Sequence, residues 1–284
     1  MASRYTRSFL FKAKMVGGAL NTLSYLAPKI AGELCFKIFC RPRKRVINSQ
    51  QTSFLATARY RDFVFGNEKV ALFHWPNIGP SVLLLHGWES QSGRWMNLIK
   101  MLQNAGFSVV AFDAPAHGNS GFKYFNPKLY GDIALAVTRE YQPEFFVGHS
   151  IGGASLCYLL SQCNSESVQA AVLMATPASH DCIYGRYAKI LGLRPSMKNL
   201  LESAIKRNLG VDPRDFDCRL FAAKIHCEVL NVYDLNDEIV PAGESIAIAN
   251  SFQKSKSLVF EDVGHRMKHE KVIRQIANYI TNFK

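Results

Sequence analysis

The stretch Phe145-Phe146-Val147-Gly148-His149-Ser150-Ile151-Gly152-Gly153 decides the fold of this chain. Phe145 to Gly148 is predicted to be a buried strand, and a helix is predicted from Ile151 to Gln162. Ser150 therefore stands at a sharp strand-to-helix turn, in a match to the pattern G-x-S-x-G. Gly148 and Gly152 leave room for a strained backbone and for a helix that crosses close to its strand. This context predicts a nucleophilic serine; the alternative is a serine that caps the helix.

Strands and helices alternate on both sides of this turn. The sequence predicts an antiparallel hairpin at 60–65 and 70–75, strands at 81–86, 107–113, 145–148, 170–176, 228–233 and 257–261, and helices at 92–104, 127–140, 151–162, 242–251 and the C-terminal end. Such alternation is typical of an α/β fold, with a mostly parallel sheet and helices on both of its faces. The polar and basic stretch 177–224 interrupts the alternation, and we interpret it as a short helical lid.

A serine hydroxyl becomes nucleophilic only when a base removes its proton, and a carboxylate must orient that base. In this respect the chain resembles an α/β-hydrolase, over Arg59 to Lys284. The family's order of nucleophile, acid and histidine implies a catalytic triad of Ser150, Asp237 and His265. Asp237 lies just past the strand at 228–233, as in the family's acid loop. His265 follows the last strand, as in the family's histidine loop.

Three other residues compete for the acid and base roles. Asp234 lies nearer the end of its strand than Asp237, and Glu238 adjoins Asp237. The spacing to Val240-Pro241 favours Asp237, because it is similar to the family pattern. His269 follows four residues after His265, and we expect it at the surface.

Two further residues near the site are interpreted as structural. His149 adjoins the serine, and we expect its side chain to point away from it. Asp113 begins the stretch 113–120, which resembles the family's D-x-P-G-x-G-x-S turn with Ala116 in place of the usual glycine. We interpret this stretch as loop architecture.

The tetrahedral intermediate of acyl transfer carries a negative oxygen, which needs fixed hydrogen-bond donors. The family geometry implies the backbone N–H of Ile151 as one donor of this oxyanion hole. It implies the N–H of Trp88, in His86-Gly87-Trp88-Glu89, as the other. Gly87 lets the backbone turn close to the substrate.

The resemblance implies a serine hydrolase that cleaves a carboxylic ester or thioester through an acyl-enzyme on Ser150, with a small-molecule substrate and with no metal or other cofactor. An acyltransferase or a C–C bond hydrolase on the same triad is an alternative, and so is a catalytically silent binding protein with the hydrolase fold. The apolar residues of the lid suggest that the substrate carries an acyl chain. The basic residues of the lid either meet an acidic head group of the substrate or form a solvated face. The residues concerned are Tyr184, Tyr187, Ile190 and Leu191, with Arg186, Lys189 and Arg194.

The positive charge of the chain is concentrated at its N-terminus. The whole sequence carries 34 Lys and Arg against 22 Asp and Glu, a net charge of +12. Ten of the basic residues and a single acid, Glu33, lie within residues 1–45, so that segment carries +9 and the remainder +3. A near-neutral body without a recognised binding motif argues against a nucleic-acid partner.

We interpret residues 1–56 as a helical arm and linker, and 57–284 as the hydrolase domain. No charge occurs from Met15 to Pro28, and apolar residues recur there and beyond at the spacing of one helix face. These residues are Val16, Ala19, Leu20, Leu23, Ala27, Ile30, Ala31, Leu34 and Ile38. Pro28 starts a second helix or kinks a single one. The uncharged run is shorter than the about 20 apolar residues of a transmembrane helix. Three interpretations stay open: an arm packed on the body, an amphipathic helix that binds an anionic membrane surface through residues 1–45, and an organelle transit peptide.

Seven cysteines include no C-x-x-C pair, and the eight histidines show no metal-ligand spacing. These patterns argue against a disulfide framework and a zinc site, and they favour a reducing compartment. We therefore expect a cytoplasmic protein, or one that is peripheral on the membrane.

Overall fold

The computed structural model describes residues 7–43, 46–163 and 167–283, and it divides the chain into two compact units. Unit 1 combines the residues up to Pro42 with Ser179–Asp217, and unit 2 combines Arg43–Ala178 with Cys218–Lys284. The N-terminal helices therefore group with most of the predicted lid, whereas residues 43–56 and 218–224 belong to unit 2. Residues 1–6 and 44–45 of the basic arm lie outside the described residues.

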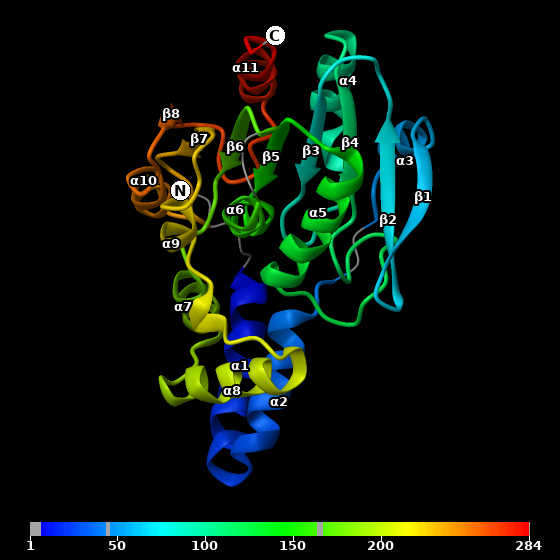
Figure 1. Cartoon of the computed structure of the whole chain (residues 1–284). Helices are drawn as coiled ribbons and strands as arrows, with labels where there is room; N and C mark the ends of the chain where they lie inside the picture. The colour runs from blue at the N-terminus through cyan, green and yellow to red at the C-terminus, as the bar shows by residue number, and fades with distance from the viewer. Residues whose placement is uncertain (1–6, 44–45, 164–166, 284) are drawn as a thin grey trace. The chain divides into compact units, whose positions relative to one another are not determined.

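Unit 2 contains an eight-stranded sheet in the order β1-β2-β4-β3-β5-β6-β7-β8 (Figure 1). The strands are β1 (Arg59–Phe65), β2 (Glu68–Trp75), β3 (Ser81–Leu85), β4 (Ser108–Phe112), β5 (Phe145–His149), β6 (Ala170–Met174), β7 (Glu228–Asp234) and β8 (Ser255–Phe260). β1 pairs antiparallel with β2, and β2 pairs antiparallel with β4, while all other neighbours are parallel. The α/β fold with a mostly parallel sheet is thereby confirmed, as is the hairpin at its edge.

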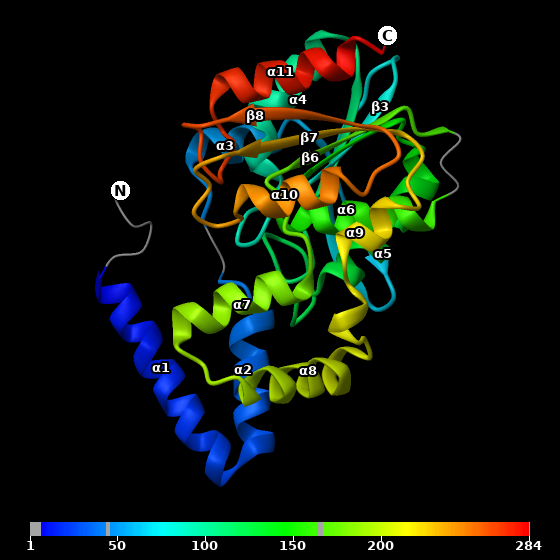
Figure 2. The ribbon, with the colours of Figure 1, turned by 90° about the vertical axis from the view of Figure 1, so that its left-hand side faces the viewer.

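Helices cover both faces of this sheet. Figure 2 shows the sheet edge-on, with α4 (Met96–Asn104) and α11 (Glu270–Thr281) on one side. The helix α3 (Ser49–Leu55) packs against α4, in the same core cluster. On the other side lie α5 (Pro127–Tyr141), α6 (Ile151–Gln162), α9 (Cys218–Ala222) and α10 (Ala242–Ala249). A short 3₁₀ turn, η1 (Ser92–Trp95), precedes α4.

The central strands are apolar on both faces because helices cover both. Every residue of β4, β5 and β6 is buried. The continuous apolar run Val82-Leu83-Leu84-Leu85 of β3 is fully buried as well. This pattern is expected for parallel strands between two helical layers. It explains why these strands have continuous apolar runs in the sequence and not alternating apolar and polar residues.

Unit 1 is helical. It consists of α1 (Arg7–Leu26), α2 (Pro28–Cys40), α7 (His180–Leu191), α8 (Ser196–Leu209) and the 3₁₀ turn η3 (Pro213–Asp215). Pro28 stands at the first position of α2, so it starts a second helix. Within unit 1, α1 packs on α7 and α2 packs on α8. No described helix of the chain is both long and apolar enough to cross a membrane.

The N-terminal helices pack through a face that hydrophobic periodicity alone does not select. Leu20 and Ala31 of the predicted apolar face are buried, but Ile30, Leu34 and Ile38 are exposed. Small residues explain the choice of face. A Cβ on Gly17 would collide with the carbonyl oxygen of Leu191 in α7, and one on Gly32 would lie 2.7 Å from the carbonyl oxygen of Leu200 in α8.

All seven cysteines are free, and five of them are buried. Burial raises the pKa of the Cys35 thiol to about 11. These thiols therefore act as small apolar residues of the interior.

Candidate active site

Ser150 occupies a strained turn between β5 and α6. Its backbone has φ 54° and ψ −125°, in the left-handed half of the φ range that non-glycine residues rarely adopt. The turn is held from both sides, since the Ser150 N–H donates to the carbonyl of Met174 at 2.8 Å. The Ser150 carbonyl accepts from the N–H of Ala154 at 3.1 Å, which starts α6.

Close backbone contacts around the turn require glycine. A Cβ on Gly152 would collide with the carbonyl oxygen of His86, and one on Gly148 would lie 2.7 Å from the Cα of Gly153. A Cβ on Gly87 would lie 2.7 Å from Nδ1 of His149. Gly153 was not singled out in the sequence, although a Cβ there would collide with Thr176 Oγ1. In the sequence, only the position of Gly153 directly after Gly152 could have indicated that it is required there.

The structure brings the side chains of Ser150, Asp237 and His265 into one hydrogen-bonded line. His265 Nε2 lies 3.0 Å from Ser150 Oγ, and His265 Nδ1 lies 2.8 Å from Asp237 Oδ2. The Asp237 side chain is 1% exposed and that of His265 is 11% exposed. The three residues follow β5, β7 and β8, whose carboxyl ends share one edge of the sheet. That edge is where open α/β sheets bind ligands.

The two candidate acids have different hydrogen-bond partners. Asp237 Oδ1 accepts from the N–H groups of Ile239 and Val240, which leaves Oδ2 to face the imidazole. Asp234 Oδ2 instead accepts from two backbone N–H groups of the histidine loop, at Val263 (2.6 Å) and Gly264 (2.9 Å). Asp234 thus ties that loop to β7.

The other competing residues lie apart from this line. Glu238 is exposed. His269 is also exposed, and it caps α11 by accepting from the Lys271 N–H.

His149 and Arg94 hold the backbone of the histidine loop. His149 Nε2 lies 2.7 Å from the carbonyl oxygen of His265, so this nitrogen carries the proton that is donated. Burial, with a smaller contribution from the charge of Arg94, lowers the pKa of His149 well below its usual value. Arg94 donates to the next carbonyl, that of Arg266, at 2.9 Å. The structural role expected of His149 thus corresponds to a specific contact, whereas no sequence pattern pointed to Arg94.

Two buried histidines connect the loop after β3 to the loop after β4. His86 donates from Nδ1 to the carbonyl of Gly87, and its Nε2 accepts from the Ala114 N–H at 2.9 Å. His117 Nε2 accepts from the Glu89 N–H at 3.0 Å. Chiefly because of burial, the pKa is lowered to about 4 for His86 and to about 3 for His117. Both rings are therefore neutral connectors at neutral pH.

The buried carboxylate of Asp113 holds the loop after β4 together and ties it to Ser92. This carboxylate accepts from the Ser92 N–H, from the Ser92 hydroxyl and from the Asn119 N–H. Burial raises the pKa of Asp113, and these three hydrogen bonds oppose the rise. These contacts agree with a role in loop architecture.

The two predicted oxyanion donors lie in the loop after β3 and in the first turn of α6. Ile151 is the first residue of α6, so its N–H has no acceptor within that helix. Trp88 is 37% exposed as a residue, and its ring packs edge-on against Phe125 and His117 at 5.5 and 5.4 Å between ring centroids. The role of both amides as an oxyanion hole stays a prediction.

Three of the lid residues proposed to meet a substrate, Tyr187, Leu191 and Arg194, contact the N-terminal helices of unit 1. Tyr184 and Leu191 are buried. The hydroxyl of Tyr187 lies 3.9 Å from Cys35 Sγ, and the Arg194 guanidinium lies 3.7 Å from the centroid of the Tyr25 ring. These side chains therefore stabilise unit 1, whatever else they do.

One group of side chains among the described residues has the spacing of metal ligands: His180, Asp181 and Glu202 in unit 1. Lys198 lies within the same group, with its Nζ 2.7 Å from Asp181 Oδ1 and 3.5 Å from Glu202 Oε1. The ammonium already supplies the positive charge that the carboxylates require, so the arrangement is explained without a metal.

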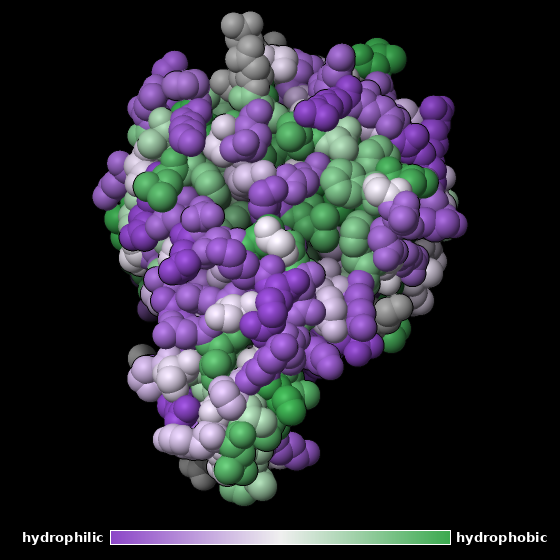
Figure 3. Space-filling view, turned by 60° about the horizontal axis from the view of Figure 1, so that its bottom comes forward, coloured by the Kyte–Doolittle hydropathy of each residue, from purple (hydrophilic) through white to green (hydrophobic). Residues whose placement is uncertain are grey.

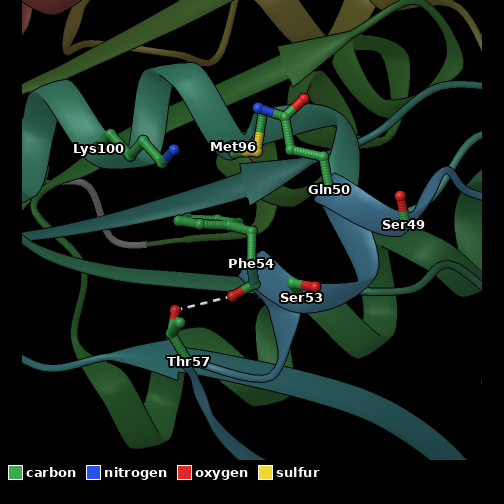
Figure 4. Close-up of a pocket in the computed structure, with 7 residues that line it drawn as sticks. All are labelled: Ser49, Gln50, Ser53, Phe54, Thr57, Met96 and Lys100. Atoms are coloured by element: carbon green, nitrogen blue, oxygen red, sulfur yellow. Dashed lines mark hydrogen bonds between the residues drawn. The ribbon is translucent and has the colours of Figure 1, made fainter.

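A hollow of about 520 Å³ lies between α3 and α4 (Figure 4). Its lining includes Ser49, Phe54, Thr57 and Lys100. None of the triad residues lines it, and the Lys100 ammonium lies 5.5 Å from the centroid of the Phe54 ring. We assign no function to this hollow.

Residues 80–197 match the family model described as the alpha/beta hydrolase fold. A serine hydrolase-like protein of Danio rerio is 34% identical over 107 residues, which cover 36% of this chain and 32% of that protein. Epoxide hydrolase B of Mycobacterium tuberculosis is 39% identical over 82 residues, 26% of this chain and 22% of that protein. The pimeloyl-[acyl-carrier protein] methyl ester esterase of Methylococcus capsulatus is 34% identical over 76 residues, 26% of this chain and 28% of that protein. The chain thus aligns with about a third or less of each of these relatives.

Solved structures resemble a larger part of the chain. The mouse alpha/beta hydrolase domain-containing protein 10 superposes with a TM-score of 0.62 at 17% identity, over 80% of this chain and 98% of that one. At this identity the likeness concerns the fold, and it agrees with the strand order described above.

Gly152→Ala is expected to lower the free energy of unfolding by about 1–3 kcal/mol, because the new Cβ has to displace the backbone of the loop after β3. Gly243→Ala is the matched control, since a Cβ at that position of α10 would meet nothing within 4 Å. We expect the control to change stability by less than about 1 kcal/mol. Urea denaturation of both variants measures the difference, and equal stability would contradict the close contact.

Acidification is expected to destabilise the protein from about pH 6.5 downward. His86, His117 and His149 stay neutral in the folded chain, whereas the unfolded chain protonates them below their usual pKa of about 6.5. The unfolded state therefore binds more protons, and stability falls as the pH falls. The raised pKa of Asp113 opposes this by one proton at most.

Burial likewise lowers the pKa of His180 to about 4, so four histidines take up protons on unfolding. A net uptake of about three protons at pH 5.5 corresponds to a slope of about 4 kcal/mol per pH unit. Urea denaturation between about pH 7 and pH 5 measures it, and His149→Gln should reduce the slope by about one proton. A slope near zero would show that these rings are not held neutral.

Proposed function

Since the chain has the α/β-hydrolase fold, we propose that it is a serine hydrolase that cleaves a carboxylic ester or thioester through an acyl-enzyme on Ser150. The observation that carries this proposal is the hydrogen-bonded line from Ser150 Oγ to His265 and on to Asp237, with distances of 3.0 and 2.8 Å. The methyl ester esterase among the relatives supports the choice of ester chemistry.

In the proposed first half-reaction, Ser150 Oγ attacks the acyl carbon while His265 Nε2 takes the hydroxyl proton. Asp237 stabilises the imidazolium through the proton on Nδ1. The carbonyl oxygen becomes an oxyanion, to which the N–H groups of Ile151 and Trp88 donate. Each such donor is worth about 3–4 kcal/mol of barrier.

The imidazolium then gives its proton to the leaving alcohol or thiol, and the acyl group stays on Ser150. In the second half-reaction His265 takes a proton from water, and the resulting hydroxide attacks the acyl carbon. Collapse of this second intermediate returns the proton to Ser150 Oγ and releases the carboxylic acid. The same residues serve both half-reactions, so no further catalytic group is required.

Backbone positioning supports the same proposal. Asp234, His149 and Arg94 each hold the backbone between Val263 and Arg266, on either side of the His265 side chain. Held in this way, His265 loses little orientational freedom when it moves a proton.

A fluorophosphonate probe is expected to label the full-length protein at Ser150, because the activated hydroxyl displaces fluoride from phosphorus. Peptide mapping by mass spectrometry identifies the labelled residue, and Ser150→Ala is the control that should lose the label. A folded wild-type protein without label at Ser150 would overturn the enzyme proposal in favour of a silent binding protein. Panels of p-nitrophenyl esters and acyl thioesters, with and without an added alcohol acceptor, then separate hydrolysis from acyl transfer.

Two isosteric variants of neighbouring acids test the triad. Asp237→Asn is expected to lower kcat by about 10⁴-fold, since the amide favours the wrong histidine tautomer. Asp234→Asn removes a charge of the same sign from a residue whose carboxylate accepts from backbone N–H groups, those of Asn236, Val263 and Gly264, and does not bond the imidazole, so its kcat loss should be at least about 100-fold smaller. Ester turnover of both variants is measured after their folding is checked by circular dichroism. The reverse order of effects would assign the acid role to Asp234.

A further inference from the structure

The outer faces of α1 and α2 in unit 1 are apolar. On α1, Phe11 is 66% exposed, Met15 62% and Leu26 81%. On α2, Ile30, Leu34 and Ile38 are exposed at a spacing of four residues, which places them in one stripe along the helix. We call these six residues the outer apolar face. Figure 3 brings this end of unit 1 toward the viewer and shows apolar side chains, in green, at its lower tip.

The opposite faces of the same helices are already occupied within unit 1. Ala13, Leu20 and Ser24 of α1 are buried, as are Ala31, Cys35 and Phe36 of α2. The close approaches of Gly17 to α7 and of Gly32 to α8 commit these faces to the interior of unit 1. The outer apolar face is therefore a second apolar surface, and packing within unit 1 does not account for it.

The charges beside this face are basic. Lys12, Lys14, Lys29 and Lys37 are exposed on the same two helices. The only acid of α1 and α2 is Glu33, and its carboxylate is held by Arg207 at 2.8 Å and Asn208 at 2.9 Å. Apolar side chains flanked by exposed lysines are complementary to an anionic lipid surface, because the apolar side chains can enter among the acyl chains while the lysines meet the phosphates.

A second copy of the chain is a poorer match for the same face. Its own outer apolar face carries the same lysines, so face-to-face association would bring like charges together.

We propose that unit 1 docks on anionic phospholipid membranes through the outer apolar face of α1 and α2. The side chains of Phe11, Met15, Leu26, Ile30, Leu34 and Ile38 enter the boundary between head groups and acyl chains, while the lysines contact lipid phosphates. This binding is separate from the chemistry at Ser150, so it stands or falls independently of the proposed hydrolase activity.

Co-sedimentation of the full chain with vesicles tests the proposal. We expect at least tenfold stronger binding to phosphatidylcholine vesicles that contain phosphatidylserine than to phosphatidylcholine alone. Leu26→Glu/Ile30→Glu should lower binding at least tenfold. The matched control Val64→Glu/Ile78→Glu adds the same charge at exposed apolar positions of unit 2, and should bind as wild type does.

Two more variants separate the components of binding. Lys12→Gln/Lys29→Gln should weaken binding and reduce its dependence on salt, since fewer charges then contact phosphates. Ser150→Ala should bind vesicles as wild type does, which keeps this result distinct from the enzyme test.

Three outcomes would overturn the proposal: absence of wild-type binding, equal binding to both vesicle types, or equal losses in the test and control variants. Analytical ultracentrifugation without lipid supplies a fourth. If wild type is a dimer that Leu26→Glu/Ile30→Glu dissociates, a second copy occupies this face and not a membrane.

Discussion

The left-handed backbone of Ser150 is the constraint on which the rest of the site depends. A side chain at φ 54° costs free energy that only the surrounding structure can offset. Here β6 offsets it through Met174, and α6 through the hydrogen bond that starts the helix. The loop after β3 must then pass close to the turn, which explains why Gly152 and Gly87 stand where a Cβ would meet backbone or ring atoms. The glycines are therefore required by the shape of the turn, and they take no part in the reaction themselves.

The histidines around this turn have two different roles. His86, His117 and His149 are buried and neutral, and each has at least one ring nitrogen hydrogen-bonded to the backbone of another loop. Burial makes them poor bases, because the charged imidazolium is not solvated there. His265 alone among the histidines near the turn faces both a hydroxyl and a carboxylate. Four histidines within one site thus differ in role because their surroundings differ, although their chemistry is the same.

The helices α1 and α2 of unit 1 each carry two apolar stripes, of which only one is buried. Both the stripe that packs and the stripe that stays exposed have the spacing of a helix face. What separates them is the size of the side chains, since Gly17 and Gly32 allow α7 and α8 to approach closely. Bulky side chains on the outer stripe would hold neighbouring helices further apart. Hydrophobic periodicity shows which side chains are apolar, but not how closely a neighbouring helix can approach them. It therefore could not distinguish the two stripes.

By itself, the sequence determined the order of strands and helices, the strand-to-helix turn at Ser150 and the short set of acids and histidines that could act with it. These follow from local patterns: buried runs, helical spacing and glycines beside a serine. Spacing and resemblance favoured Asp237 over Asp234, but only the tertiary structure showed which carboxylate faces His265. Asp234 is the last residue of β7 and accepts from backbone N–H groups of the histidine loop, whereas Asp237 lies three residues further on and places Oδ2 against the imidazole. The contribution of Arg94 likewise became visible only when residues 172 positions apart met at the carbonyl of Arg266. Long-range contacts of this kind depend on how loops close around the sheet, and no local pattern encodes them.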